Sequence, residues 1–221
     1  AVLNLVDKGK LRLEQYVFIE KSDLLVDTWS PLRDKYPLGN VNVKLSEILS
    51  FTVSQSDNSG CDILFKLIGG TAKADSLIKK FGIEDISIVA TEAEMHKEWD
   101  VQYKNWTSPE ATVQLLKKFY KQQLLSKSST NFLYKLMAET STGTNRLKGL
   151  LPKGTEVAHK TGSSGQKDGL TAAFNDVGIV KLPNGKHYAI AVFITDSKED
   201  DENNAAIIAE ISKAVWAYYN H

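Results

Sequence analysis

The sequence has few of the residues that build covalent or metal-bound frameworks. Cys61 is the one cysteine among 221 residues, so no disulfide can form within the chain. The four histidines are scattered, and no pair of His or Cys residues has the spacing of metal ligands, so we expect no metal. A chain without disulfides fits a reducing compartment, and equally a periplasmic protein that does without them.

An excess of charge of one sign and long apolar runs are missing too. Lys plus Arg and Asp plus Glu both number 27, which leaves a net charge of zero. Without a basic stripe, neither nucleic acid nor an anionic membrane is expected as the main partner. No apolar run approaches the length of a membrane span. The 42% of apolar residues is ordinary for a globular protein, and the length allows one large domain or two small ones.

What is present is a helical middle followed by strands and a closing helix. Apolar spacing and capping residues predict helices at 46–53, 61–68, 72–81, 107–120, 131–139 and 203–219. The segments 171–181 and 187–195 flank Pro183-Asn184-Gly185 and read as a β-hairpin, in which the apolar strand 188–194 has both faces covered. Residues 90–105 are predicted to form a long irregular loop, and loops of that kind are usually functional or disordered.

A candidate anion-binding edge follows the alternating segment 155–158. Lys160 supplies a point charge, Thr161 a rotatable donor, and Gly162 lets a ligand approach the backbone. Taken alone, this triplet is better interpreted as an ordinary edge strand that runs into a Ser/Gly loop, because short patterns often match by chance. Two further features precede it, Ser56-Asp57-Asn58 at a helix boundary and Glu92 in the irregular loop.

Glu92 lies 36 residues and Lys160 lies 104 residues after Ser56. These three features, in this order and at these intervals, resemble the class A serine β-lactamases and their penicillin-binding relatives. That group pairs Ser-Asp-Asn and Lys-Thr-Gly with a nucleophile motif Ser-x-x-Lys. The resemblance extends over essentially the whole chain. It implies an α/β (α+β) fold, with an antiparallel sheet flanked by helices plus an all-α region. It also implies a β-lactam substrate, a serine acyl-enzyme and no cofactor.

The resemblance assigns roles to the matching residues. Ser56 would relay a proton to the leaving β-lactam nitrogen, Asp57 would tie the helix junction together, and Lys160 would support Ser56 and attract the substrate carboxylate. Ser163 would supply half of the oxyanion hole through its N–H. The remaining substrate-binding residues are expected to contact the substrate side chain, its carboxylate or the mouth of the cleft: Asn58, Thr161, Ser163, Arg146 and Trp29.

Glu92 distinguishes the hydrolysing members of this group from those that stay acylated. By resemblance it activates the water that hydrolyses the serine ester, and transpeptidases that lack it stay acylated. As a lone residue it could be a solvated loop acid. A β-lactam-binding but slowly hydrolysing penicillin-binding or sensor relative therefore remains the alternative function.

The loop around Glu92 departs from the common pattern in a way that resembles the extended-spectrum PER/VEB-type branch. Asp62 stands where an Asn usually contacts the loop, and Ala90 with Asn105 replaces a common Arg–Asp bridge across its neck. His96 is expected either to help position the deacylating water or to be an exposed loop histidine. The resulting hypothesis is a wider cleft that accepts bulky oxyimino-cephalosporins.

No Ser-x-x-Lys stands at the expected position before Ser56. Ser76-Leu77-Ile78-Lys79 and Ser164-Gly165-Gln166-Lys167 match only by letters, because both follow Ser56. We therefore expect residues to be missing upstream of Ala1 and this chain alone to be inactive. The alternative to a functional enzyme is a fragment that needs a complementing N-terminal piece. The expected organisation is one domain over 1–221, with an all-α region at about 22–145 and a sheet region at about 1–21 and 146–221. Family resemblance further implies a periplasmic monomer.

Overall fold

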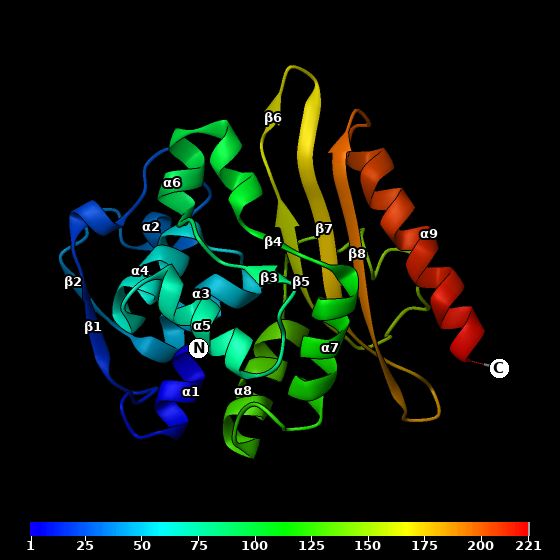
Figure 1. Cartoon of the computed structure of the whole chain (residues 1–221), viewed down its shortest axis with the longest axis horizontal. Coiled ribbons are helices and arrows are strands. Elements are labelled where there is room, and N and C mark those ends of the chain that lie inside the picture. Colours follow the sequence, from blue (N-terminus) through cyan, green and yellow to red (C-terminus); the bar gives the residue numbers. More distant parts are fainter. Residues whose placement is uncertain (221) are drawn as a thin grey trace.

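The computed structural model describes residues 1–220 and places a twisted antiparallel sheet beside a helical body (Figure 1). The central strand of the sheet, β7, pairs with β8 along one edge and with β5 and the short β6 along the other. The strands of this sheet are β5 (Val157–Ser163), β6 (Gln166–Lys167), β7 (Leu170–Lys181) and β8 (His187–Ser197). The turn between β7 and β8 pairs Lys181 with His187, so the predicted hairpin is confirmed.

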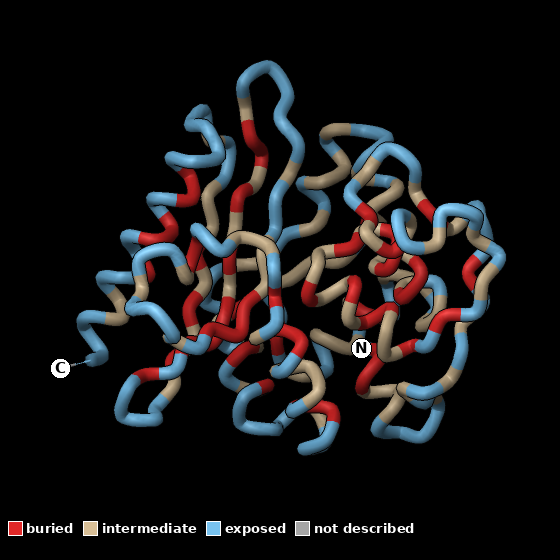
Figure 2. Tube along the Cα trace, turned by 180° about the vertical axis from the view of Figure 1, so that it is seen from behind, coloured by how far each residue is buried: buried red, intermediate tan, exposed pale blue. Residues whose placement is uncertain are grey.

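Helices cover both faces of this sheet. The long helix α9 (Asp201–Tyr219) packs on one face, where Ile208 joins Val180 and Ile190 in an apolar cluster. Two helices, α7 (Pro109–Tyr120) and α8 (Lys127–Ala138), pack on the other face. The apolar strand β8 lies between these layers, as its unbroken apolar run predicts. Figure 2 shows the buried residues concentrated along the strands and in the middle of the helical body.

The helical body has its own core, in which Leu32, Leu45 and Ile48 are fully buried. Its helices lie close to the predicted ranges, and Gly69 ends α4 in the left-handed conformation at φ 91°. The helical segments of this body are α1 (Val2–Asp7), η1 (Lys21–Asp23), α2 (Pro31–Lys35), α3 (Leu45–Ser54), α4 (Asn58–Ile68) and α5 (Thr71–Lys80). Over residues 1–220, no helix is both long enough and apolar enough to cross a membrane.

The placement of residues 1–21 with the sheet is wrong. The strand β1 (Tyr16–Ile19) pairs only with β2 (Val41–Lys44), in a separate two-stranded sheet. The side chains of Leu3 and Ile19 are buried in the core of the helical body. The extended pattern of 16–19 indicates a strand but does not specify its partner, because partner choice depends on long-range packing.

The irregular loop at 90–105 also differs from expectation, because most of it is helical. It contains α6 (Glu92–Lys97) and the 3₁₀ helix η2 (Trp99–Lys104), and the pair β3 (Ile86–Ser87) and β4 (Trp106–Thr107) closes its base. Thr91 and Glu94 form a reciprocal capping box at the start of α6. That signature, S/T-x-x-E, is visible in the sequence and explains why the helix begins there.

Candidate active site

A cavity of about 410 Å³ lies between the helical body and the edge strand β5. The structure brings Ser56, Glu92 and Lys160 together in it, although they are far apart in the sequence. Its lining residues are Trp29, Thr52, Ser56, Asp57, Asn58, Cys61, Glu92, Thr142, Arg146, Lys160, Thr161, Gly162 and Ser163. The volume is within the range of small-molecule sites.

The junction between α3 and α4 presents Ser56 to this cavity. Ser56 has φ 56°, an uncommon conformation for a non-glycine residue that is held by its surroundings. The next residue, Asp57, is 1% exposed and caps α4 by accepting a hydrogen bond from the N–H of Gly60 at 2.7 Å. Its carboxylate also accepts from the N–H of Leu32 and the hydroxyl of Ser30. Asp57 thus fixes the start of two helices at once.

Lys160 lies on β5 and donates a hydrogen bond to the hydroxyl of Ser56 and another, of 2.8 Å, to the carbonyl of Thr161. Burial lowers the pKa of Lys160, and the charge of Glu92 is among the influences that oppose this shift. A desolvated ammonium beside a serine hydroxyl can polarise that hydroxyl and attract an anion. The position therefore suits proton transfer through Ser56.

Glu92 is the first residue of α6, and its carboxyl faces the same cavity. Burial, reinforced by the nearby charge of Asp62, raises the pKa of Glu92 to about 7, while Lys160 acts in the opposite direction. A carboxyl that titrates near neutral pH is suited to accept a proton from water. Asp62 orients this residue directly, since its carboxylate accepts the N–H groups of Glu92 and Ala93 at 2.8 and 2.9 Å.

The neck of the loop is closed by hydrogen bonds to Asn105. Its carboxamide oxygen accepts the N–H groups of Val89 and Ala90, and its nitrogen donates to the carbonyl of Ala90 at 2.9 Å. An uncharged side chain thus joins the two ends of the loop. His96, in contrast, is exposed on α6 and is not among the residues that line the cavity, so the structure favours the exposed-loop alternative for it.

At the other end of the cavity, Arg146 organises the hydroxyl-rich end of β5. Its guanidinium donates to the hydroxyl of Ser163 at 2.6 Å and to the carbonyls of Gly162 and Asn175. The guanidinium also lies 3.6 Å from the ring centre of Phe174, a cation–π contact. The hydroxyls of Ser163 and Thr161 and the backbone near Gly162 form a donor-rich surface beside two cations, suited to a carboxylate.

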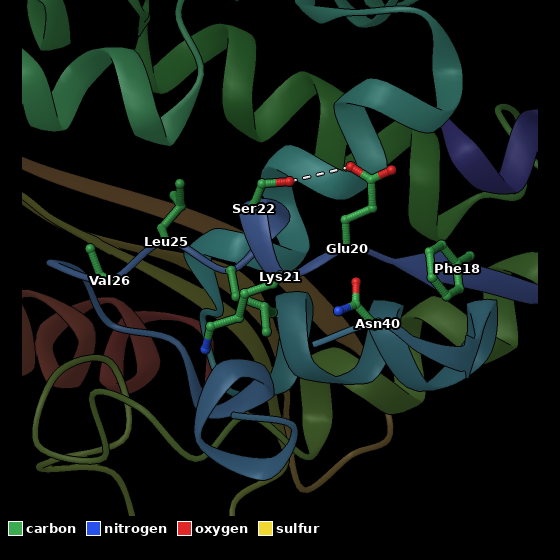
Figure 3. Close-up of a pocket in the computed structure, with 8 residues that line it drawn as sticks. Phe18, Glu20, Lys21, Ser22, Leu25, Val26 and Asn40 are labelled. Carbon is green, nitrogen blue, oxygen red and sulfur yellow. Dashed lines mark hydrogen bonds between the residues drawn. The ribbon is translucent and has the colours of Figure 1, made fainter. Parts of the chain in front are cut away.

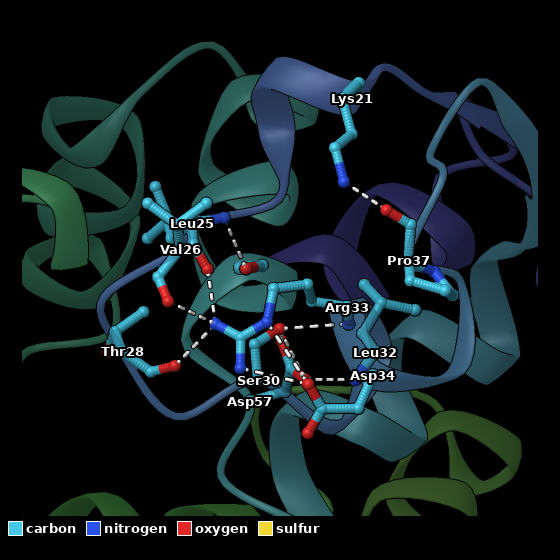
Figure 4. Close-up of polar contacts among 11 residues, drawn as sticks. Lys21, Leu25, Val26, Thr28, Ser30, Leu32, Arg33, Asp34, Pro37 and Asp57 are labelled. Atoms are coloured by element: carbon cyan, nitrogen blue, oxygen red, sulfur yellow. Dashed lines mark hydrogen bonds and ion pairs between the residues drawn. The ribbon is translucent and has the colours of Figure 1, made fainter.

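The mouth of the cavity is formed by the loop that carries Trp29. The indole is 59% exposed and donates to the carbonyl of Gln55 at 2.8 Å. The residue before it, Thr28, accepts a hydrogen bond from the side-chain nitrogen of Asn58. Arg33 in turn donates to the carbonyls of this loop, as Figure 4 shows.

Several of these residues are not predicted from the sequence. Thr142 shares a hydrogen bond of 2.8 Å with the hydroxyl of Thr161, and Cys61 lies near Glu92 with a pKa raised by burial. Arg33 contacts backbone carbonyls. Every residue has such a carbonyl, so the amino-acid types at 25, 26 and 28 do not indicate the contact. For Cys61, the helical repeat from Asn58 along α4 could have indicated a position near the cavity.

The two segments that match Ser-x-x-Lys in residue type, 76–79 and 164–167, lie outside the cavity. Ser76 is on α5, where Lys79 forms an ion pair with Asp75 at 2.8 Å, and Ser164 is in the turn between β5 and β6. Neither serine lines the cavity. In the part of the chain that the structure describes, no three His, Cys, Asp or Glu side chains form a group that could hold a metal ion.

A sequence model of the β-lactamase enzyme family matches residues 1–219. The β-lactamase VEB-1 of Pseudomonas aeruginosa is 52% identical over 221 residues, which cover 99% of this chain and 74% of that protein. The chain belongs to the class A β-lactamase family. The extended-spectrum β-lactamase PER-1 of Pseudomonas aeruginosa is 46% identical, over 98% of this chain and 70% of that protein.

Solved structures give the same class A β-lactamase fold. The crystal structure of the TLA-1 extended-spectrum β-lactamase superposes with a TM-score of 0.98 at 60% identity and covers 100% of this chain and 80% of that one. The predicted fold class and the resemblance to the PER/VEB-type branch are both confirmed.

Proposed function

We propose that the cavity between α4, α6 and β5 is the site at which this class A β-lactamase hydrolyses the β-lactam ring of penicillins and cephalosporins, an activity that confers antibiotic resistance. The proposal rests on family membership together with one observation. A carboxyl with a pKa near 7 and an ammonium bonded to a serine hydroxyl share a single cavity. That combination suits hydrolysis of an ester by an activated water.

In this proposal the reaction has two steps. A serine attacks the β-lactam carbonyl and forms an ester, while Ser56, supported by Lys160, delivers a proton to the leaving nitrogen. Glu92 then accepts a proton from a water that attacks the ester, and the carboxylic acid product leaves. The raised pKa of Glu92 matches this role, because a base close to neutral is both present in its free form and strong enough to act.

The substrate is oriented at its two ends. Thr161, Ser163 and Arg146 bind the carboxylate of the β-lactam, and the N–H of Ser163 donates to the oxyanion of the tetrahedral species. Asn58 hydrogen-bonds the side-chain amide at the opposite end, and Trp29 covers the mouth of the cleft. The placement of all five residues around one cavity supports this division.

The acylated serine is proposed to lie outside residues 1–221, in a Ser-x-x-Lys segment. Support comes from the two letter matches in this chain, neither of which lines the cavity. Covalent catalysis requires an activated nucleophile, so residues 1–221 alone are expected to be inactive. The proposed location is the periplasm, as a monomer, on family resemblance.

The substrate range is proposed to include bulky oxyimino-cephalosporins. The neck of the loop is joined by the uncharged Asn105, and Asp62 holds its start, so the loop follows a path set by carboxamide and carboxylate contacts to the backbone. Comparing the turnover of ceftazidime with that of benzylpenicillin tests this point. A strict penicillinase would contradict it.

The experiment that tests the function compares two samples, the complete gene product and residues 1–221 alone. The complete product is expected to hydrolyse a chromogenic cephalosporin, and residues 1–221 are expected neither to hydrolyse it nor to gain the mass of a covalent adduct. A complete product that acquires an adduct and keeps it for hours would instead indicate a penicillin-binding or sensor protein. Hydrolysis by residues 1–221 alone would refute the proposed origin of the nucleophile.

A further inference from the structure

The segment 24–29 carries Trp29 of the cleft mouth, yet little apolar packing holds its outer side. Val26 is 72% exposed, and a hollow of about 750 Å³ lies against Leu24, Leu25 and Val26. Figure 3 shows this hollow, with Lys21 and Asn40 on its other walls. Leu24 is 3% exposed and belongs to the core of the helical body, so apolar contacts fix the start of the segment but not its exposed part around Val26.

A guanidinium is one of the polar anchors of this part of the segment, beside the N–H of Leu25 on Ser59 and the indole of Trp29 on Gln55. Arg33, on α2, donates from one terminal nitrogen to the carbonyls of Leu25, Val26 and Thr28 at 2.6, 3.0 and 2.8 Å (Figure 4). Its other nitrogens donate to the carboxylate of Asp34, which holds the guanidinium plane. A planar group with donors in a fixed geometry is suited to gather several carbonyls of one turn.

The anchored segment connects directly to the substrate-binding side chain of the cavity. The hydroxyl of Thr28 accepts a hydrogen bond from the side-chain nitrogen of Asn58, which occupies one donor of that carboxamide. The contact sets which way the carboxamide is turned and leaves its oxygen and its second N–H for the amide of a ligand. The carbonyl and the hydroxyl of Thr28 thus couple Arg33 to Asn58.

We propose that Arg33 is a positioning residue that sets substrate specificity. It fixes Thr28, Thr28 orients the carboxamide of Asn58, and Asn58 hydrogen-bonds the amide of the acylamino side chain of the β-lactam. Arg33 touches no substrate itself. This inference rests on the proposed function, because it assigns Asn58 to the substrate side chain.

The test measures the kinetics of the complete gene product on two substrates, benzylpenicillin and 6-aminopenicillanic acid, which lacks the acyl group. Replacing Arg33→Ala is expected to raise KM for benzylpenicillin by about two- to tenfold, the range for one lost hydrogen bond, and to leave KM for 6-aminopenicillanic acid unchanged. Arg33→Lys should restore part of the loss, because lysine keeps donors near the carbonyls. Asp34→Ala removes only the carboxylate that holds the guanidinium plane and keeps the donors to the three carbonyls, so it should raise KM for benzylpenicillin less than Arg33→Ala does.

A double-substitution cycle separates this mechanism from a general loss of structure. Thr28→Val removes the hydroxyl at similar volume and should raise KM for the same substrate only. The effects of Arg33→Ala and Thr28→Val should then be less than additive, because both act through Asn58. Fully additive effects, or equal KM changes for both substrates, would overturn the proposal.

Hydrogen exchange of residues 24–29 distinguishes the failure of this inference from the failure of the proposed function. Arg33→Ala should speed exchange at the N–H of Leu25, which donates to Ser59, more than Asp34→Ala does. Unchanged exchange would overturn the anchoring role. An unaltered protein that hydrolyses neither substrate would refute the proposed function, while the exchange comparison still decides whether Arg33 holds the segment.

Discussion

Replacing Glu92→Gln should change how the stability of the protein depends on pH. The pKa of Glu92 is raised from its ordinary value of 4.5 to about 7, chiefly by burial. Because the folded state holds this proton more tightly than the unfolded state, the free energy of unfolding falls as the pH rises from about 4.5 to about 7. The full difference corresponds to about 3 kcal/mol, at about 1.4 kcal/mol per pH unit.

The Gln variant lacks this titration, so its stability relative to the unaltered protein should increase from pH 4 to pH 8 by up to about 3 kcal/mol. Urea unfolding at several pH values measures the difference, and any constant cost of burying the amide cancels between them. The control is Glu94→Gln, on the same helix. Hydrogen bonds from Thr91 lower the pKa of Glu94, so its pH dependence should have the opposite sign. Parallel stability curves for Glu92→Gln and the unaltered protein would refute the assignment.

Three further substitutions test the supports of the cavity. Asp57→Ala removes the acceptor of three donors in a buried site and should cost about 3 kcal/mol or more of unfolding free energy, whereas the exposed Asp34→Ala should change it by about 0.5 kcal/mol at most. Asn105→Ala opens the neck of the loop, so limited proteolysis should cut within 92–104 sooner, and an unchanged cleavage rate would contradict the closing role. Arg146→Met removes the donors to Ser163 and the nearby carbonyls, and KM should rise about tenfold for substrates with a free carboxylate. An equal rise for a substrate whose carboxylate is esterified would argue against a carboxylate site.

Local sequence signals specify most of the helices and the hairpin of this fold. The hydroxyl of Ser108 followed by Pro109 marks the start of α7, and the Asn184-Gly185 turn joins β7 to β8. These features depend on neighbouring residues alone, so the sequence reveals them. The capping box of Thr91 and Glu94 is equally local, and the helix it starts could have been predicted.

Contacts between distant segments are not predictable in the same way. The pairing of β1 with β2 depends on the core that receives Ile19, which no local pattern identifies. In the site, too, some residues are visible in the sequence and others are not. The motifs around Ser56 and Lys160 indicate its position, whereas the anchor at Arg33 is directed at carbonyl groups that every residue carries.

The most direct test of the central claim follows the mass of the complete gene product after it is mixed with benzylpenicillin. If Glu92 activates the water that cleaves the serine ester in the cavity shared with Ser56 and Lys160, the unaltered protein should return to its free mass within seconds. The Glu92→Gln variant should instead keep the mass of one added substrate for minutes or longer. Equal release of the adduct by both proteins, or no adduct on either, would contradict the account.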